Sequence, residues 1–152
     1  TRINNGYGRS QGNYRDEYKD FFLYRAYEIE KPDTIRVEES IKAFSCPVVI
    51  LVGRYTFSAA EDFLVGIYEN PDRPVIIGEP TGGSTGAPLV IRLPHDAVAR
   101  ICTLRVLFPY SGSPFVGKGI QPDIVVKRSV ADYLEGKDPV LAKAISYLEE
   151  KH

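Results

Sequence analysis

Residues 47–78, PVVILVGRYTFSAAEDFLVGIYENPDRPVIIG, decide the fold of this chain. The first segment, 47–53, is continuously apolar and rich in β-branched residues, which is typical of a strand buried on both faces. A helix is predicted over 58–68, ending before Pro71, and residues 74–78 predict a second buried strand. A strand, a helix and a strand in about 30 residues indicate a parallel crossover unit, so the sequence predicts the α/β class.

The segment upstream of this unit is polar at first and then aromatic. Residues 1–13 are rich in glycine and asparagine and predict a loop. Residues 14–28 carry aromatic side chains near helical spacing and predict an amphipathic helix, and residues 34–37 predict a short strand.

Downstream of the unit, the pattern predicts a hairpin, one more strand and two helices. Three strands are expected, at 88–93, 99–107 and 124–126. The first two are joined by a turn around His95 and Asp96. Residues 130–134 predict a short helical turn. A last helix begins at the capping residue Asp138, with Pro139 at its first position, and its apolar stripe consists of Leu141, Ala142, Ile145 and Leu148.

Charge and composition exclude several classes of partner. The chain has 19 basic and 20 acidic residues and a net charge of −1, which argues against a nucleic-acid or anionic-membrane surface. No apolar run approaches the roughly 18 residues of a membrane span. The two cysteines, Cys46 and Cys102, do not form a zinc-binding spacing, and their apolar neighbours predict buried packing. No metal or cofactor is expected.

The segment TFSAAE, residues 56–61, has two interpretations. Ser58 follows a buried strand and begins a helix, where a hydroxyl is placed to attack a substrate and the N–H of Ala59 can donate to a developing oxyanion. Ser58 and Glu61 also form the S-x-x-E pattern of a capping box, in which both side chains bind backbone N–H groups. The pattern alone favours the cap.

Two glycine-rich loops are further candidates. Residues 82–86, GGSTG, follow a strand and can cradle an anion or form a flexible turn. The opening segment 4–8, NNGYG, can supply backbone donors or form a turn. The usual base for a serine nucleophile is histidine. His95 lies at the predicted hairpin tip and His152 is the last residue, so neither position favours catalysis.

Taken together, these segments resemble the catalytic domain of the C-terminal-processing (tail-specific) serine peptidases and their tricorn-core relatives. The resemblance covers nearly the whole chain. It is carried by four segments in order: Arg2–Gly8 (RINNGYG), Val48–Glu61, Gly78–Gly83 (GEPTGG) and Gly117–Asp123 (GKGIQPD).

The resemblance implies a ClpP/crotonase-like spiral of strand-strand-helix units with a mixed, largely parallel sheet. It implies peptide hydrolysis through an acyl-enzyme, with Ser58 as the nucleophile and with oxyanion donors from the N–H of Ala59 and of Gly6 or the adjacent Tyr7. The loop Gly82-Gly83-Ser84 is expected to contact the polypeptide substrate. The family also implies an extracytoplasmic location, periplasmic or secreted.

Several departures from the family pattern limit this expectation. The lysine-using branch has its base where Ser84 stands, so a Ser–Lys pair is not available from that loop. The other branch uses a histidine upstream of the segment that begins at Arg2, and a glutamate at the place of Val116. We therefore expect residues 1–152 to be the C-terminal part of a catalytic domain, inactive alone, which associates with its upstream part or with a second copy.

Two other functions remain open at this point. A non-catalytic peptide-binding or scaffold homologue would explain the missing lysine, the missing histidine and Val116. A crotonase-fold acyl-CoA enzyme would need Glu61 or Glu79 as its acid or base.

Overall fold

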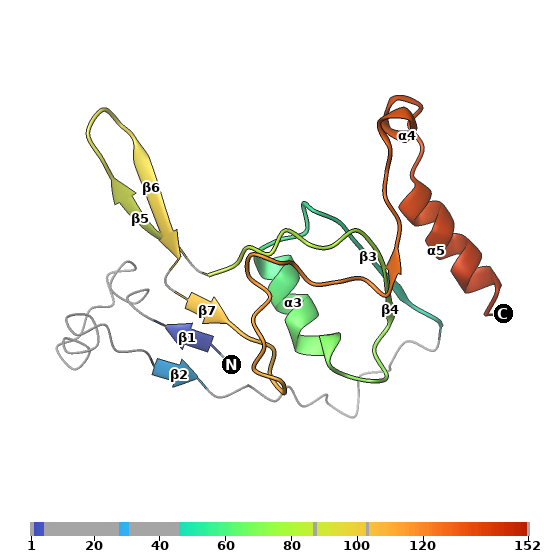
Figure 1. Ribbon diagram of the computed structural model, residues 1–152, viewed down its shortest axis with the longest axis horizontal. Helices are drawn as coiled ribbons and strands as arrows, with labels where there is room; N and C mark the ends of the chain where they lie inside the picture. The colour runs from blue at the N-terminus through green and yellow to red at the C-terminus, as the bar shows by residue number, and fades with distance from the viewer. Residues whose placement is uncertain (1, 5–27, 31–45, 87, 103, 152) are drawn as a thin grey trace.

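The computed structural model of the chain describes residues 2–4, 28–30, 46–86, 88–102 and 104–151. Its strands are β1 (Arg2–Asn4), β2 (Glu28–Glu30), β3 (Val49–Val52), β4 (Val75–Gly78), β5 (Pro88–Arg92), β6 (Val98–Cys102), β7 (Leu104–Val106) and β8 (Ile124–Val125). Its helices are α3 (Ala59–Tyr68), α4 (Val130–Leu134) and α5 (Pro139–Glu149) (Figure 1).

The centre of the fold is the predicted crossover unit. β3 pairs with β4 in parallel, with Val49 opposite Val75 and Val52 opposite Gly78, and β4 pairs in parallel with β8. A side chain at Gly78 would lie 1.8 Å from the carbonyl oxygen of Val52, and its φ is 141°, so this pairing requires glycine there. The α/β class and the largely parallel central sheet are confirmed.

Helix α3 packs its apolar face into a small core. Leu64 and Val65 from α3 meet strand residues and the segment that follows β7. The other buried members of this cluster are Val52, Ile76, Val106, Phe108, Phe115 and Ile120. Tyr68 stacks on Phe108 with ring centroids 5.0 Å apart. The core therefore anchors α3 against both the sheet and the segment that leads to residue 120.

Burial differs from the prediction at β3 and α5. β3 is not buried on both faces: its Leu51 is 40% exposed, and Val48, just before the strand, is 45% exposed. The apolar stripe of α5 is also largely uncovered, since Leu141 and Ile145 are about half exposed and only Ala144 is buried. α5 lies against β3 and β4, but the described residues leave the side chains of Leu51, Leu141 and Ile145 exposed.

The predicted burial of the cysteines is wrong. Cys46 and Cys102 are both free and exposed. Cys46 lies just before β3, and Cys102 lies at the end of β6, in a hairpin whose strands have few packing neighbours. The apolar neighbours of Cys102 in the sequence did not predict its burial correctly, because β6 itself is mostly exposed.

The antiparallel strands form two sheets that are separate from the central one. β1 pairs with both β2 and β7, so Arg2–Asn4 is a strand rather than the predicted loop. The predicted strand over 99–107 divides into β6, which pairs with β5, and β7, which joins the other sheet. The hairpin turn includes His95 and Asp96, as predicted, with φ of 60° and 59°. The predicted helix 14–28 and strand 34–37 lie outside the described residues, except that Glu28 begins β2.

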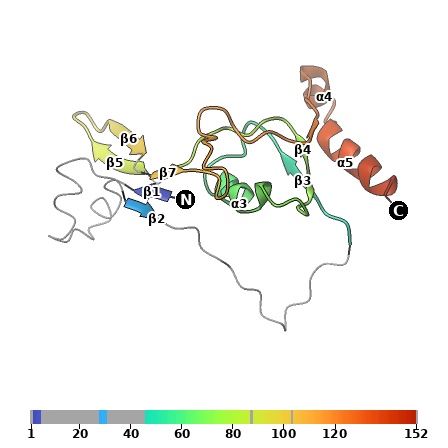
Figure 2. The ribbon, with the colours of Figure 1, turned by 60° about the horizontal axis from the view of Figure 1, so that its bottom comes forward.

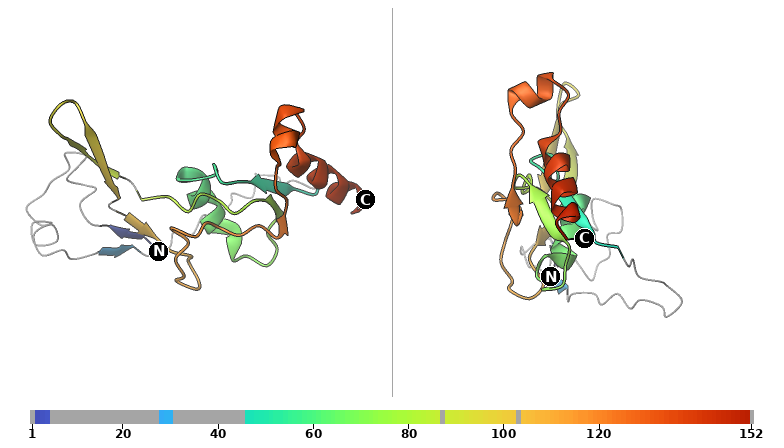
Figure 3. Two further views of the ribbon diagram at one scale, coloured as in Figure 1. Left: turned by 45° about the horizontal axis from the view of Figure 1, so that its top comes forward. Right: turned by 90° about the vertical axis from the view of Figure 1, so that its right-hand side faces the viewer.

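The elements form an elongated arrangement. The β5–β6 hairpin projects at one end, α4 and α5 lie at the other, and α3 lies between them (Figures 1 and 2). The left view of Figure 3 shows the same order along the long axis, and its right view looks along that axis. None of the described helices is long and apolar enough to cross a membrane.

Candidate active site

Ser58 has a strained and exposed position at the start of α3. Its φ is 57° and its ψ is −128°, a backbone conformation that side chains other than glycine rarely adopt. Such a conformation costs roughly 1–3 kcal/mol and persists only where the surroundings enforce it. In α/β-hydrolases, a strained turn between a strand and a helix exposes the nucleophilic serine hydroxyl.

The capping-box interpretation of Ser58 and Glu61 is wrong. The Ser58 side chain makes no capping hydrogen bond, although the N–H groups of Glu61 and Asp62 donate to its carbonyl oxygen at 2.8 and 3.0 Å. The N–H groups of Ala59 and Ala60 find no acceptor among the described residues. The helix therefore begins with a free hydroxyl beside two free donors, at the end where the helix dipole is positive.

The turn that precedes Ser58 is closed by Thr56. Thr56 N–H donates to the carbonyl of Gly53 at 2.7 Å, and the Thr56 hydroxyl accepts from Gly53 N–H at 3.1 Å. The carbonyl of Thr56 in turn accepts from Gly82 N–H at 2.9 Å. This chain of bonds joins the end of β3 to the loop after β4.

The loop of residues 81–85 lies directly against the serine. Ser58 N–H donates to the carbonyl oxygen of Ser84 at 2.7 Å. The N–H groups of Gly83 and Ser84 donate to Glu61 at 2.7 and 2.8 Å, and Gly82 N–H is held by Thr56. The N–H groups of Gly82, Gly83 and Ser84 are therefore used within the protein, and the anion-cradle interpretation of the loop stays a prediction. The contact of Gly82, Gly83 and Ser84 with a substrate stays a prediction.

Glu61 is a completely buried carboxylate. It is 0% exposed, and besides the two backbone N–H groups it accepts a short hydrogen bond from the Thr81 hydroxyl. Because it is buried, Glu61 is not placed to serve as the acid or base of an acyl-CoA enzyme. Its neighbour Asp62 accepts from the Thr85 hydroxyl at 2.9 Å. Both carboxylates of the first helical turn therefore bind the loop of residues 81–85. The S-x-x-E pattern did not predict this role, because it is also the pattern of a capping box.

A third loop completes this arrangement. Ile120 N–H donates to the Thr81 hydroxyl at 2.7 Å, and Gly117 N–H donates to the carbonyl of Gly83 at 2.8 Å. A side chain at Gly119 would lie 2.1 Å from the carbonyl oxygen of Thr81. The glycines of the GKGIQPD segment thus allow two backbones to approach each other behind the serine.

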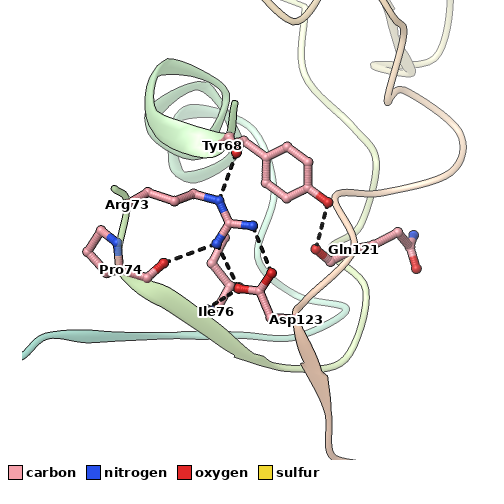
Figure 4. Close-up of polar contacts among 6 residues, drawn as sticks. All are labelled: Tyr68, Arg73, Pro74, Ile76, Gln121 and Asp123. Carbon is pink, nitrogen blue, oxygen red and sulfur yellow. Dashed lines mark hydrogen bonds and ion pairs between the residues drawn. The ribbon is translucent and has the colours of Figure 1, made fainter. Parts of the chain in front are cut away.

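The end of the same segment is fixed by an ion pair (Figure 4). Asp123 accepts two hydrogen bonds from the Arg73 guanidinium, at 2.7 and 2.8 Å, and one from Ile76 N–H at 2.8 Å. Arg73 also donates to the carbonyl of Tyr68 at 2.7 Å and lies over its ring at 4.8 Å. The hydrogen bonds from Arg73 hold the pKa of Asp123 below its ordinary value, and the same bonds raise the pKa of Arg73.

Glu69, just after α3, binds another distant loop. It accepts from Tyr110 N–H at 2.7 Å and from Ser111 N–H at 3.2 and 3.3 Å. Burial acts to raise the pKa of Glu69, but the hydrogen bonds from Ser111 and Tyr110 outweigh it and leave the pKa lowered.

A cleft of about 890 Å³ opens beside the turn that precedes Ser58. It is lined by the end of β3, by residues 53–56 and by residues from α4 and the start of α5. Ser58 is not among the lining residues, but Thr56, two positions before it, is. The cleft therefore adjoins the candidate site on the side of the sheet edge.

The remaining predicted residues are only partly located. Gly6 and His152 lie outside the described residues. His95 is exposed at the hairpin tip. Val116, at the place of the family's glutamate, is 44% exposed. No described residue makes a hydrogen bond with the Ser58 hydroxyl, so within the described ranges the serine has no base in contact.

Sequence reasoning missed the residues that hold the site together. Thr81 was seen only as part of a motif, and the pairing of Arg73 with Asp123 spans 50 positions. One signal was present. The first turn of the helix carries two adjacent acidic residues, Glu61 and Asp62, whereas a capping box needs only one, so the second indicates a further binding partner.

The chain is similar in sequence and in fold to several known proteins. The chain is 30% identical over 98 residues to a carboxy-terminal-processing protease of Bartonella bacilliformis, an alignment that covers 64% of this chain and 22% of that protein. A crystal structure from Parabacteroides merdae, described as a candidate peptidase, aligns with a TM-score of 0.59 and 28% identity over 72% of this chain and 34% of that one. The chain thus spans about a fifth of the curated relative and about a third of the solved one.

The fold also resembles that of the tricorn protease. That crystal structure aligns with a TM-score of 0.55 and 24% identity, over 68% of this chain and 10% of the tricorn chain. None of these relatives supports the acyl-CoA alternative. The family model that matches the chain, over residues 4–126, is peptidase family S41. Because this match covers most of the chain and includes Ser58 and the three loops around it, the chain belongs to peptidase family S41.

Proposed function

We propose that the protein acts as a serine peptidase in which Ser58 attacks the peptide carbonyl and forms an acyl-enzyme. The observation that carries this proposal is the conformation of Ser58: an exposed hydroxyl on a strained turn, with no capping bond, beside the unpaired N–H groups of Ala59 and Ala60. The Ala59 N–H stabilises the oxyanion, together with an N–H of the opening turn at Gly6.

The proton of Ser58 is taken by a histidine from the upstream part of the protein. Ser84 stands where the lysine-using branch has its base, and the described residues bring no other base to the hydroxyl. Neutral histidine is the usual partner of a serine nucleophile because its pKa lies near the working pH.

The upstream part of the catalytic domain also completes the fold. Residues 1–152 are the C-terminal part of that domain, and the exposed apolar side chains of β3 and α5 support this, since large uncovered apolar surface marks a contact region. Association with a second copy is the alternative cover. Light scattering of the chain, alone and with the co-expressed upstream part, distinguishes a 1:1 complex from a homodimer.

The substrate is a polypeptide, and a C-terminal segment is the first class to test. The curated relative is named for carboxy-terminal processing, and family S41 is a peptidase family. From the resemblance to the tail-specific peptidases, we also propose that the protein acts outside the cytoplasm. Fractionation of cells that express the tagged full-length protein tests this location.

A fluorophosphonate probe tests the proposed activity in the full-length protein. The probe should label the wild type and should not label Ser58→Ala. Ser113→Ala, which changes an exposed serine outside the site, is the matched control and should label normally. Absence of labelling in the folded wild type would remove the peptidase proposal.

A non-catalytic peptide-binding homologue is the second candidate. The exposed Val116 favours it, because an apolar side chain there cannot orient a histidine base. This candidate predicts that C-terminal peptides bind to the full-length protein, that the probe does not label it, and that Ser58→Ala binds peptides as well as the wild type.

A further inference from the structure

The carboxylate of Glu61 has no place in the mechanism proposed above, yet it is buried deeply beside the nucleophile. Placing a charged group in the protein interior costs several kcal/mol unless hydrogen bonds compensate. Here three donors compensate: the Thr81 hydroxyl, Gly83 N–H and Ser84 N–H. The role of the Glu61 carboxylate therefore depends on what its three hydrogen-bond donors contact.

Those partners belong to the loop that holds Ser58. Ser84 N–H donates to Glu61, which fixes the backbone of Ser84. The carbonyl oxygen of Ser84 then accepts a hydrogen bond from Ser58 N–H at 2.7 Å. A Ser58 with φ of 57° needs such an external bond, because its own backbone preference opposes the conformation. Glu61 therefore acts on Ser58 through the loop and not by contact with a substrate.

The loop is also fixed from behind. The Thr81 hydroxyl donates to Glu61 and accepts from Ile120 N–H at 2.7 Å, so the carboxylate, the loop and the 117–120 segment form one network. Gly83 has φ of 65°, and a side chain there would lie 2.6 Å from Gly119 N. The loop is therefore closely packed against the 117–120 segment. If one of its hydrogen bonds to Glu61 is lost, it has little room to move to a new position.

We propose that Glu61 is a positioning residue, whose carboxylate binds the 81–84 loop and thereby holds Ser58 in its strained conformation with the Ala59 and Ala60 N–H groups free. The predicted effect on the reactivity of Ser58 rests on the peptidase function proposed above. The predicted effect of Glu61 on the conformation of Ser58 does not. An error of about 1 Å in the position of a nucleophile can reduce the rate on the order of 100-fold.

The variant Glu61→Gln tests this proposal in the full-length protein. The amide keeps the size of the side chain but replaces one acceptor oxygen by an NH₂ group, which then faces an N–H donor. We expect the rate of fluorophosphonate labelling of Ser58 to fall on the order of 100-fold. With a peptide substrate, kcat should fall with KM changed less than about 3-fold, because the substrate does not contact Glu61.

Glu69→Gln is the matched control. Glu69 follows the same helix and also accepts N–H bonds from a distant loop, but that loop does not touch Ser58. The Glu69→Gln variant should be labelled at the wild-type rate.

If Glu61→Gln is too unstable to assay, Thr81→Val removes one member of the network. Thr81→Ser should restore most of the labelling rate because it restores the hydroxyl. A folded Glu61→Gln variant, or Thr81→Val variant, that labels at the wild-type rate would overturn the proposal.

Amide hydrogen exchange separates this inference from the proposed function. The Ser58 amide should exchange at least about 10-fold faster in Glu61→Gln, while the amides of Leu64 and Ile76 in the core keep their protection. If the wild type does not label, the peptidase proposal fails and this measurement alone decides the positioning role. Faster exchange confined to Ser58 and the loop supports it, and unchanged exchange at Ser58 contradicts it.

Discussion

The two ends of helix α3 differ in whether their polar groups have partners. At its start, Ser58 is strained, and neither its hydroxyl nor the N–H groups of Ala59 and Ala60 have a partner among the described residues. At its end, the polar groups are satisfied: Arg73 binds Asp123 and the carbonyl of Tyr68. The strained residue thus lies at the end that carries the proposed nucleophile, and the paired polar groups lie at the other end.

Carboxylates show the same contrast in detail. Glu61 at one end and Glu69 at the other each accept two backbone N–H bonds from a loop distant in sequence. Glu61 is completely buried and its loop contacts the nucleophile, whereas the loop bound by Glu69 contains exposed residues Tyr110 and Ser111. Substitutions at the start of α3, at Ser58 or Glu61, should therefore alter activity. Substitutions near its end, at Glu69 or Arg73, should alter stability alone.

The largest expected effect is that of Ser58→Ala. Peptide hydrolysis by the full-length protein should fall by more than about 10³-fold, because the nucleophile is lost. The melting temperature should stay within about 2 °C, since the Ser58 side chain makes no bond in the described structure. A calorimetric scan beside the activity assay checks both parts. A large loss of stability would mean that the hydroxyl has a structural role.

Gly119→Ala should destabilise the protein by roughly 2–4 kcal/mol. The added side chain meets the backbone of Thr81 at 2.1 Å, and φ at this position is 77°. Urea unfolding measures the change. Gly117→Ala is the matched control, because its φ is 82° but its added side chain meets nothing within 4 Å. Equal losses in the two variants would show that conformation alone, and not the close approach, requires glycine.

Arg73→Lys should lower the free energy of unfolding by roughly 1–2 kcal/mol, because lysine cannot make the paired hydrogen bonds to Asp123. Partial exposure of Asp123 limits the loss. The rate of fluorophosphonate labelling should not change. A variant that lost labelling without unfolding would contradict the division between the two ends of the helix.

The pH dependence of stability should report the same ion pair. The pKa of Asp123 is lower in the folded protein than its ordinary value of about 3.9, so its contribution is present above that pH and is lost as the pH falls through the folded value. Asp123→Asn should therefore differ from the wild type by about 1 kcal/mol at pH 6 and by less at pH 3. Urea titrations at both values measure this, and a constant difference would rule out the ion pair as its source.

Ser58→Gly has the smallest expected effect and the opposite sign. Glycine adopts a positive φ without strain, so the variant should gain about 0.5–1 kcal/mol after the entropy of the unfolded chain is included. A loss of stability measured by urea unfolding would show that the Ser58 conformation is not strained in solution.

The sequence predicted the central unit because its periodicity is strong. The apolar runs at 47–53 and 74–78 and the helix between them leave few alternatives, and β3, α3 and β4 appear there. Burial was harder to predict: Val48, Leu51 and Cys46 are exposed, since a strand at the edge of the described sheet lacks the neighbour that its composition implies.

The site was predicted in part. The position of Ser58 at a strand-to-helix turn followed from the pattern, but the partners of Glu61 did not, because the same S-x-x-E spacing serves a capping box. The distinction depends on Thr81, Gly83 and Ser84, about 20 positions away, and no local pattern encodes such a contact.

The identity of the residue that the probe modifies tests the central claim most directly. Mass spectrometry of peptides from the labelled, full-length protein should find the phosphonate on Ser58 alone. A phosphonate on another residue, with Ser58 recovered unmodified, would show that the start of α3 does not carry the nucleophile.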